Sequence, residues 1–112
     1  MYKRQVFTHW RAEALDDVPE RYTEFEARVV GALEDTAARG GRSLVVTSTG
    51  VIGMVLRHIL DLGHASHMKV IIQCMNTSVH RIEWVHGQLY LGSYNGVPHL
   101  ERPERQQAQT FY

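Results

Sequence analysis

The hydrophobic pattern of the chain changes most sharply at the four residues Thr47 to Gly50. Before them, Leu44 to Val46 form an apolar run without alternation, which is typical of a strand buried on both faces. After them, apolar residues recur at helical spacing from Val51 to Leu60, and Gly63 provides a stop signal for a helix. The pattern therefore predicts a buried strand at 43–47, a tight turn and a buried helix.

The rest of the chain contains further periodic stretches. Apolar residues at spacings of three and four predict an amphipathic helix from about Pro19 to Arg39. Alternation between Thr77 and Ser93, around the turn residues His86 and Gly87, predicts a β-hairpin. His64 to Asn76 is compatible with a strand or a short helix, because periodicity alone does not separate the two. Glu101 to Gln109 is expected to form a polar surface tail.

The length and composition of the chain favour some classes of protein over others. The chain has 112 residues, enough for one domain with a modest core. It has 12 basic and 12 acidic residues, so its net charge of zero does not favour nucleic acid or an anionic membrane as a partner. No apolar run approaches the length of about 20 residues that spans a bilayer. The single cysteine, Cys74, cannot form an internal disulfide, which indicates a reducing, cytoplasmic setting.

The first five residues, Met1 to Gln5, resemble the translation of a transposon-end adapter used in sequencing libraries. We therefore expect residues 1–5 to be a scar of library preparation, to be excluded from reasoning about the fold. On this interpretation, residues 6–112 are the C-terminal portion of a single domain whose N-terminal part is missing. The alternative is an ordinary basic N-terminus.

The turn after the predicted strand is the main candidate site. In open α/β sheets, ligands bind beyond the carboxyl ends of the strands, where a helix N-terminus offers N–H groups and a positive dipole end. Three hydroxyl groups lie at this turn, so the sequence predicts a phosphate held by Thr47, Ser48, Thr49 and Gly50. The alternative is that Thr and Ser only cap the helix.

Two other chemistries have weaker signals. The chain has seven histidines but no HExxH or CxxC pattern, so we predict no metal site. The turn partly fits the Gly-x-Ser-x-Gly elbow of a serine hydrolase with Ser48 as nucleophile. Val46 stands where the elbow needs its first glycine, and Asp61 and His99 are the downstream acid and base available to it.

From Glu20 to Leu100 the sequence resembles the C-terminal half of the histidine phosphatase superfamily, which has the phosphoglycerate-mutase-like fold. Four segments match family landmarks in the family's order: Pro19-Glu-Arg-Tyr22 before a helix that carries Arg28, Leu44-Val-Val-Thr-Ser-Thr-Gly-Val-Ile52, Asn76-Thr-Ser-Val79, and Asn95-Gly-Val-Pro-His-Leu100. The resemblance implies an α/β fold with three layers, in which helices flank a mostly parallel sheet.

The resemblance also implies a reaction, phosphoryl transfer from a phosphomonoester to a histidine and then to water or a hydroxyl, without a metal or organic cofactor. The partner would be a phosphorylated small molecule or a phosphoprotein, and an oligomer is compatible with this. Glu20 and His99 become further candidate loop or site residues.

This chain departs from the family at the catalytic residues. It contains no Arg-His-Gly, the motif that carries the nucleophilic histidine of the family, and Ser48 stands where the family has its second catalytic histidine. A serine hydroxyl donates a hydrogen bond but brings no positive charge. We therefore expect a fragment of a histidine-phosphatase-family protein that is itself inactive. A non-catalytic module that binds phosphate esters or another partner is the alternative.

Overall fold

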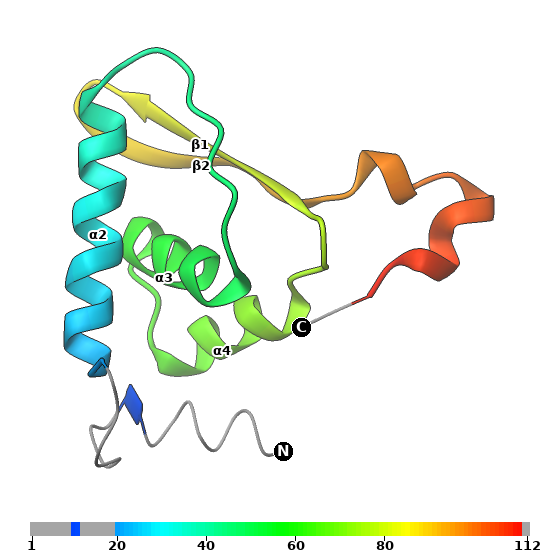
Figure 1. The fold of residues 1–112 in the computed structure, drawn as a ribbon, viewed down its shortest axis with the longest axis horizontal. Coiled ribbons are helices and arrows are strands. Elements are labelled where there is room, and N and C mark those ends of the chain that lie inside the picture. The colour runs from blue at the N-terminus through cyan, green and yellow to red at the C-terminus, as the bar shows by residue number, and fades with distance from the viewer. Residues whose placement is uncertain (1–9, 12–19, 111–112) are drawn as a thin grey trace. The chain divides into compact units, whose positions relative to one another are not determined.

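The computed structural model describes residues 10–11 and 20–110, so the segment interpreted as an adapter scar lies outside the described residues. The chain divides into two units, residues 1–44 and 45–112, and each is described by itself. The first unit contains helix α2, and the second contains two helices, a hairpin and two short 3₁₀ helices (Figure 1). The elements are α2 (Tyr22–Ala38), α3 (Thr49–Leu60), α4 (His64–Gln73), β1 (Val79–Val85), β2 (Gln88–Gly96), η1 (Pro98–Leu100) and η2 (Pro103–Ala108).

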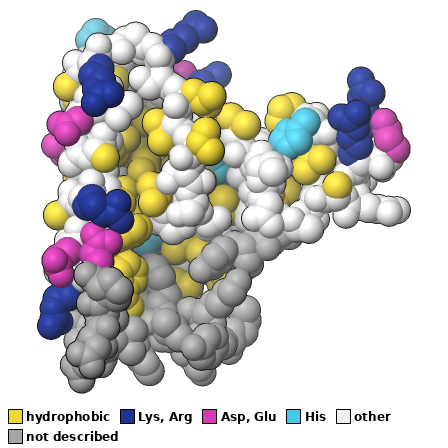
Figure 2. Space-filling view, in the orientation of Figure 1, with side chains coloured by type: hydrophobic (Ala, Val, Ile, Leu, Met, Phe, Trp, Pro, Cys, Tyr) yellow, Lys and Arg dark blue, Asp and Glu magenta, His cyan; other side chains and the backbone are white. Residues whose placement is uncertain are grey.

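Helix α2 confirms the amphipathic pattern that predicted it. Its side chains at Tyr22 and Val29 are buried, whereas charged side chains follow its outer side (Figure 2). The Glu24 side chain accepts a hydrogen bond of 3.1 Å from the backbone N–H of Arg21, which satisfies one free donor at the start of the helix. The helix ends before Gly40, which has a φ of 70° that a residue with a side chain rarely adopts.

Helices α3 and α4 form the packed part of the second unit. Met54 and Leu56 of α3 are almost completely buried, as is Ile71 of α4. The two helices approach closely at Gly53, where an added Cβ atom would lie 2.6 Å from Cγ1 of Ile71. Of the stretch from His64 to Asn76, for which the sequence allows a strand or a helix, residues His64–Gln73 are helical, and His67 and Ile71 lie against Gly53 of α3.

The stop signal after α3 is not the one predicted. Asp61 adopts the left-handed conformation with a φ of 53°, and its N–H donates to the carbonyl of Arg57. Gly63, the predicted stop residue, instead precedes α4 as its N-cap. An aspartate tolerates the left-handed region better than most residues, so the chain reverses two residues earlier than the glycine indicates.

The predicted hairpin is confirmed. Strands β1 and β2 pair antiparallel, and the turn residues His86 and Gly87 both have positive φ, as a type I′ turn requires. The side chain of Asn95 in β2 bridges to the end of α4. Its amide donates to the carbonyl of Gln73 at 2.8 Å, and its oxygen accepts from the N–H of Met75 at 2.7 Å.

The prediction of a buried strand at 43–47 is wrong in this structure. The segment has no regular secondary structure (Figure 1). The side chains of Leu44 and Val46 are 89% and 90% exposed. A strand buried on both faces needs hydrogen-bonded neighbours and covering layers, and the described residues do not supply them.

The sheet of the described residues consists of two antiparallel strands only. The chain is thus a mixed helix and strand protein, whereas the mostly parallel, three-layer sheet and the missing N-terminal part stay predictions. The predicted surface tail is exposed, but Pro103–Ala108 forms the 3₁₀ helix η2.

Candidate anion-binding site

The turn at Thr47 to Gly50 leads directly into α3. Ser48 is the N-cap residue, with extended backbone angles, and the first intrahelical bond runs from the N–H of Ile52 to the Ser48 carbonyl at 3.0 Å. The N–H groups of Thr49, Gly50 and Val51 therefore have no acceptor inside the helix. They lie at the positive end of a 12-residue helix whose last turn carries Arg57 and His58.

Ser48 does not act as a side-chain cap. Its hydroxyl makes no capping hydrogen bond, and the residue is exposed. An N-cap serine usually accepts a bond from an N–H of the first turn, which would occupy a donor that an anion needs. Here the Ser48 hydroxyl does not occupy an N–H group of the first turn, so the arrangement is compatible with an anion at this helix start.

Thr49, unlike Thr47 and Ser48, is partly buried. Its hydroxyl donates to the thiol sulfur of Cys74, at an O···S distance of 4.0 Å. That contact directs the Thr49 side chain toward the interior, so only its backbone N–H remains for a ligand. Of the three hydroxyls at the turn, those of Thr47 and Ser48 belong to exposed residues.

Cys74 belongs to a polar cluster with Ser78 and His80. The thiol sulfur lies 3.6 Å from Oγ of Ser78 and 3.8 Å from Nε2 of His80, and those two atoms are 2.9 Å apart. Nδ1 of His80 accepts a hydrogen bond of 3.0 Å from the backbone N–H of Asn95. In the neutral ring the proton is therefore on Nε2, which donates to Ser78.

This tautomer limits the chemistry of the cluster. A general base needs an unprotonated nitrogen facing the hydroxyl, and a metal-binding imidazole needs one facing the ion. Nε2 of His80 carries the proton, so it presents no unprotonated nitrogen to Ser78 or Cys74. Burial also lowers the pKa of His80, which further favours the neutral ring. The cluster holds α4, the loop after it and β2 together.

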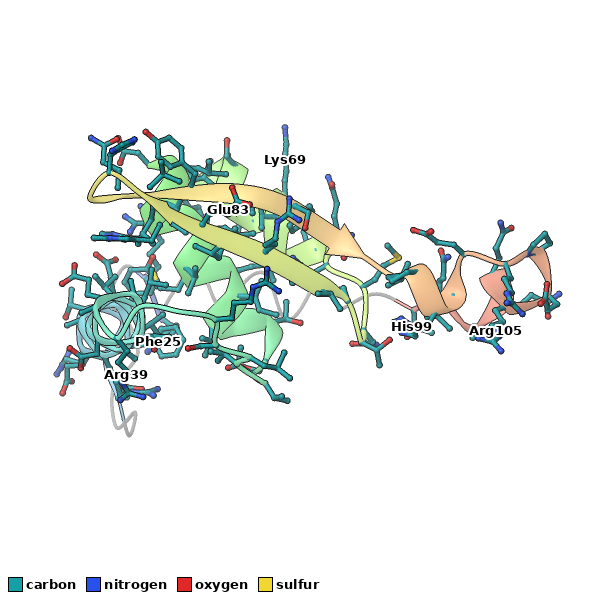
Figure 3. The ribbon with its side chains drawn as sticks, turned by 90° about the horizontal axis from the view of Figure 1, so that it is seen from above. Phe25, Arg39, Lys69, Glu83, His99 and Arg105 are labelled. Carbon is teal, nitrogen blue, oxygen red and sulfur yellow. The ribbon has the colours of Figure 1, made fainter. Side chains whose placement is uncertain are left out.

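His99 lies in η1, far in sequence from the turn that leads into α3. Its hydrogen bonds go to other parts of the chain. Its Nε2 and the hydroxyl of Thr77 are 2.9 Å apart, and its carbonyl accepts a bond of 3.1 Å from the Arg105 side chain (Figure 3). These contacts join η1 to the residues before β1 and to η2. Positioning of the C-terminal loop is the role that they support.

Glu20 lies in the other unit, where it forms a two-point ion pair with Arg28. The Nε and Nη2 atoms of Arg28 donate to the two carboxylate oxygens at 2.9 and 3.1 Å. The hydrogen bonds from Arg28 hold the pKa of Glu20 below its usual value. Glu20 is thus engaged in holding the start of α2.

The described residues contain neither a metal-binding cluster nor a membrane-spanning helix. No group of three or more histidine, cysteine or acidic side chains in residues 10–11 and 20–110 is arranged to hold a metal ion. Within the same ranges, no helix has both the length and the apolar character for crossing a bilayer. A serine nucleophile would need a base beside Ser48, yet the hydrogen bonds of His80 and His99 go to Ser78 and Thr77.

Comparison with known families gives one match, to the histidine phosphatase superfamily (branch 1), over residues 2–96. Because the match covers most of the chain, the protein belongs to the histidine phosphatase superfamily. Comparisons with curated proteins and with solved structures gave no match.

Sequence reasoning missed the residues that organise the cluster. In the sequence, Cys74 bears only on disulfide formation, and His80 is one of seven scattered histidines. Asn95 and Ser78 are landmarks of the family resemblance, which gives them no structural role. The sequence contains one signal for them: Ser78 and His80 are two residues apart at the start of the predicted hairpin, and side chains two residues apart in an extended chain point the same way.

Proposed function

We propose that this chain binds the phosphoryl group of a phosphomonoester at the N-terminus of α3, as part of a histidine-phosphatase domain. The observation that carries the proposal is the uncapped start of α3, where the exposed Ser48 leaves the first-turn N–H groups open. Membership of a phosphatase superfamily supports phosphate as the anion. Thr47, Ser48 and the N–H groups of Thr49 and Gly50 are the proposed contacts.

We further propose that the 112-residue chain binds without catalysing hydrolysis. Phosphoryl transfer through a histidine requires a nucleophile, cations around the phosphate and an acid for the leaving group. The sequence lacks Arg-His-Gly, and residues 43–56 contain neither lysine nor arginine. Ser48, at the position of the second catalytic histidine, supplies a neutral donor, and losing one preorganised donor of this kind lowers rates by about 10²–10³.

The natural partner would be a phosphorylated small molecule or a phosphoprotein, and the setting cytoplasmic. The free, buried Cys74 fits a reducing compartment. A non-catalytic phosphate-binding role is favoured over hydrolysis because residues 43–56 contain neither lysine nor arginine. Binding through N–H groups and hydroxyls of this stretch should be weak, because hydrogen bonds from charged donors are the stronger ones.

Titration with inorganic phosphate, followed by amide NMR, tests the proposal. The N–H signals of Thr49, Gly50 and Val51 should shift in a saturable way, and more than they shift with equal concentrations of chloride. Ser48→Ala should weaken binding, whereas Ser43→Ala, a matched change at an exposed serine, should not. Shifts confined to another part of the chain would leave the turn as the start of a helix and nothing more.

A further inference from the structure

The pairing of β1 with β2 contains a bulge beside His80. Between two of the paired positions, β1 contributes one residue, His80, whereas β2 contributes two, Tyr94 and Asn95. Asn95 is left-handed, with a φ of 63°, which is the conformation that glycine usually provides in such a bulge. The extra residue of a bulge lacks a partner in the strand ladder. The backbone N–H of Asn95 therefore needs an acceptor outside the ladder.

Three hydrogen bonds within the second unit hold Asn95 in place. Its backbone N–H donates to Nδ1 of His80 at 3.0 Å. Its side-chain amide donates to the carbonyl of Gln73 at 2.8 Å, and its side-chain oxygen accepts from the N–H of Met75 at 2.7 Å. These bonds offset the cost of a left-handed backbone at a residue with a side chain. Asn95 thus ties β2 to the end of α4 and to the loop of residues 74–78 that follows it.

The ring of His80 is fixed from its other sides. Its Nε2 lies 2.9 Å from the hydroxyl of Ser78, and the ring packs against that of Tyr94 with centroids 5.1 Å apart. A protonated imidazole carries an N–H on both nitrogens. Protonation would therefore set the Nδ1–H of His80 against the N–H of Asn95, and the ring could turn away only by giving up both contacts. Uptake of a proton and the bond to Asn95 exclude each other.

We propose that His80 and Asn95 form an acid-sensitive latch, which opens when His80 takes up a proton. Asn95 then leaves the ring and gives up its bonds to Gln73 and Met75. The loop of residues 74–78, which carries the buried thiol of Cys74, is released while α3 and the rest of the hairpin stay folded. Local openings of this kind need less free energy than unfolding of the whole chain.

The groups around the ring set the direction of the pH dependence. The titratable groups in contact with His80 are the thiol of Cys74, from the loop after α4, and the phenol of Tyr94, from β2. Burial raises the pKa of Tyr94, so its phenol stays neutral. Helix α3 reaches the cluster through the uncharged Thr49, whose hydroxyl donates to the Cys74 sulfur.

No carboxylate of the described residues forms an ion pair with His80, and burial lowers its pKa from the ordinary value of 6.5. In the open state the ring is solvated and titrates near its ordinary value. The open state therefore binds a proton more readily than the closed state, and acidification below pH 6.5 favours opening.

Amide hydrogen exchange of the full chain, followed by NMR between about pH 5 and 7, tests the latch. Protection is expressed relative to an unstructured chain at the same pH. The amides of Met75 and Asn95 should lose protection together as the His80 ring titrates, by at most about tenfold per pH unit, because one proton is involved. The amide of Leu56, a buried residue of α3, should be better protected than either at every pH.

His80→Asn should give a latch that acid does not open. The side-chain oxygen of asparagine lies close to the position of Nδ1 in histidine, so it accepts from the N–H of Asn95 at every pH. This variant should keep Met75 protected at acidic pH. His86→Asn is the matched control, because it makes the same change at an exposed histidine in the hairpin turn, and it should keep the pH dependence of the wild type.

Asn95→Gly should leave the loop released at every pH. Glycine adopts the left-handed conformation readily and keeps the backbone N–H, but it removes the two side-chain bonds to Gln73 and Met75. The amide of Met75 should then exchange rapidly even at neutral pH, and its pH dependence should disappear. The amides of the hairpin should stay protected, because glycine preserves the bulge.

The reactivity of Cys74 provides a second measurement. Its thiol is 2% exposed, so a dithiodipyridine reagent reaches it only through openings of the structure. The rate is divided by that of the urea-unfolded chain at the same pH, which removes the effect of thiol ionisation. This ratio should rise severalfold between about pH 7 and 5.5 in the wild type and stay constant in His80→Asn.

Three results would overturn the latch. Equal protection of Met75 and Leu56 would show that acid unfolds the whole chain. The same pH dependence in the wild type and in His80→Asn would show that His80 is not the group that opens it. A constant reactivity of Cys74 in the wild type, while the His80 ring titrates, would show that the loop stays closed. All of these measurements are made without phosphate, so they are independent of the proposed function.

Discussion

Nδ1 of His80 accepts a hydrogen bond of 3.0 Å from the backbone N–H of Asn95, across the strand pair of the hairpin. The bond requires an unprotonated Nδ1, so protonation of His80 must break it. Burial lowers the pKa of His80 from its ordinary value of 6.5, and the ring packs against that of Tyr94 with centroids 5.1 Å apart. The folded state therefore binds a proton at His80 less readily than the unfolded state does.

We predict that His80 makes the folded state less stable at acidic pH. Well above pH 6.5 the ring is neutral in both states and has no linked effect. As the pH falls below 6.5 toward the lowered pKa, the unfolded state takes up the proton first, and the free energy of unfolding decreases. Denaturant unfolding of the wild-type chain and of His80→Gln, each measured between about pH 5 and 8, isolates this contribution from the other histidines.

The two series should diverge, with the wild type losing more stability than His80→Gln on acidification. Parallel curves would show that the Asn95 hydrogen bond does not hold His80 neutral.

The second prediction concerns the contact between α3 and α4. A Cβ atom at Gly53 would come within 2.6 Å of Cγ1 of Ile71 and 3.2 Å of Nε2 of His67, all in buried residues. Gly53→Ala should therefore destabilise the fold by about 1–3 kcal/mol, as overpacking of a core does. Chemical denaturation at fixed pH measures the change.

Gly31→Ala is the matched control, because an added Cβ at Gly31, in the middle of α2, would meet nothing within 4 Å. Removing a glycine from a helix interior should stabilise α2 by about 0.5–1 kcal/mol. The two substitutions thus have opposite signs. A stabilising Gly53→Ala would mean that α3 and α4 separate easily at this point.

Local patterns predicted the elements whose residues are close in sequence. The apolar stripe of α2 and the alternation around His86 and Gly87 each carry the information for one element, so both were predicted correctly. The segment Leu44 to Val46 has the composition of a strand, but a strand forms only with partners that are distant in sequence. Its composition alone could not reveal that the described residues provide no such partner.

For the candidate site too, local features were predicted from the sequence and contacts between distant residues were not. The turn and the start of α3 follow from the change of period after Thr47, and both are present. The contact between Thr49 and Cys74 joins residues 25 positions apart, and the tautomer of His80 depends on an N–H 15 positions away. Neither relationship leaves a periodic signal, because each depends on how α3, α4 and β2 pack.

A third prediction follows from the hairpin turn. His86 has a φ of 48° and Gly87 a φ of 76°. Asparagine tolerates the first of these positions better than histidine, and Asn-Gly is the preferred type I′ pair. His86→Asn should raise the free energy of unfolding by up to about 1 kcal/mol. Thermal or chemical unfolding would detect it.

Gly87→Ala should act in the opposite direction. An added Cβ at Gly87 would meet nothing within 4 Å, so any loss of stability comes from the positive φ alone. That loss is expected to be about 1 kcal/mol or more. If His86→Asn were destabilising and Gly87→Ala neutral, the turn would not be type I′ in solution.

The last prediction concerns catalysis by the chain itself. The 112 residues contain no Arg-His-Gly, and the proposed anion site lies in a stretch, residues 43–56, that contains neither lysine nor arginine. We therefore expect no hydrolysis of p-nitrophenyl phosphate or of phosphosugars above background. The control for contaminating phosphatases is Ser48→Ala, purified in parallel, whose trace activity should equal that of the wild type. Activity that is abolished by Ser48→Ala would contradict the prediction and make Ser48 a nucleophile. Ser48→His should leave this chain inactive, because a histidine at position 48 cannot replace the absent nucleophile. In a protein that also contains Arg-His-Gly, the same substitution should increase turnover if positive charge at this position is what limits it.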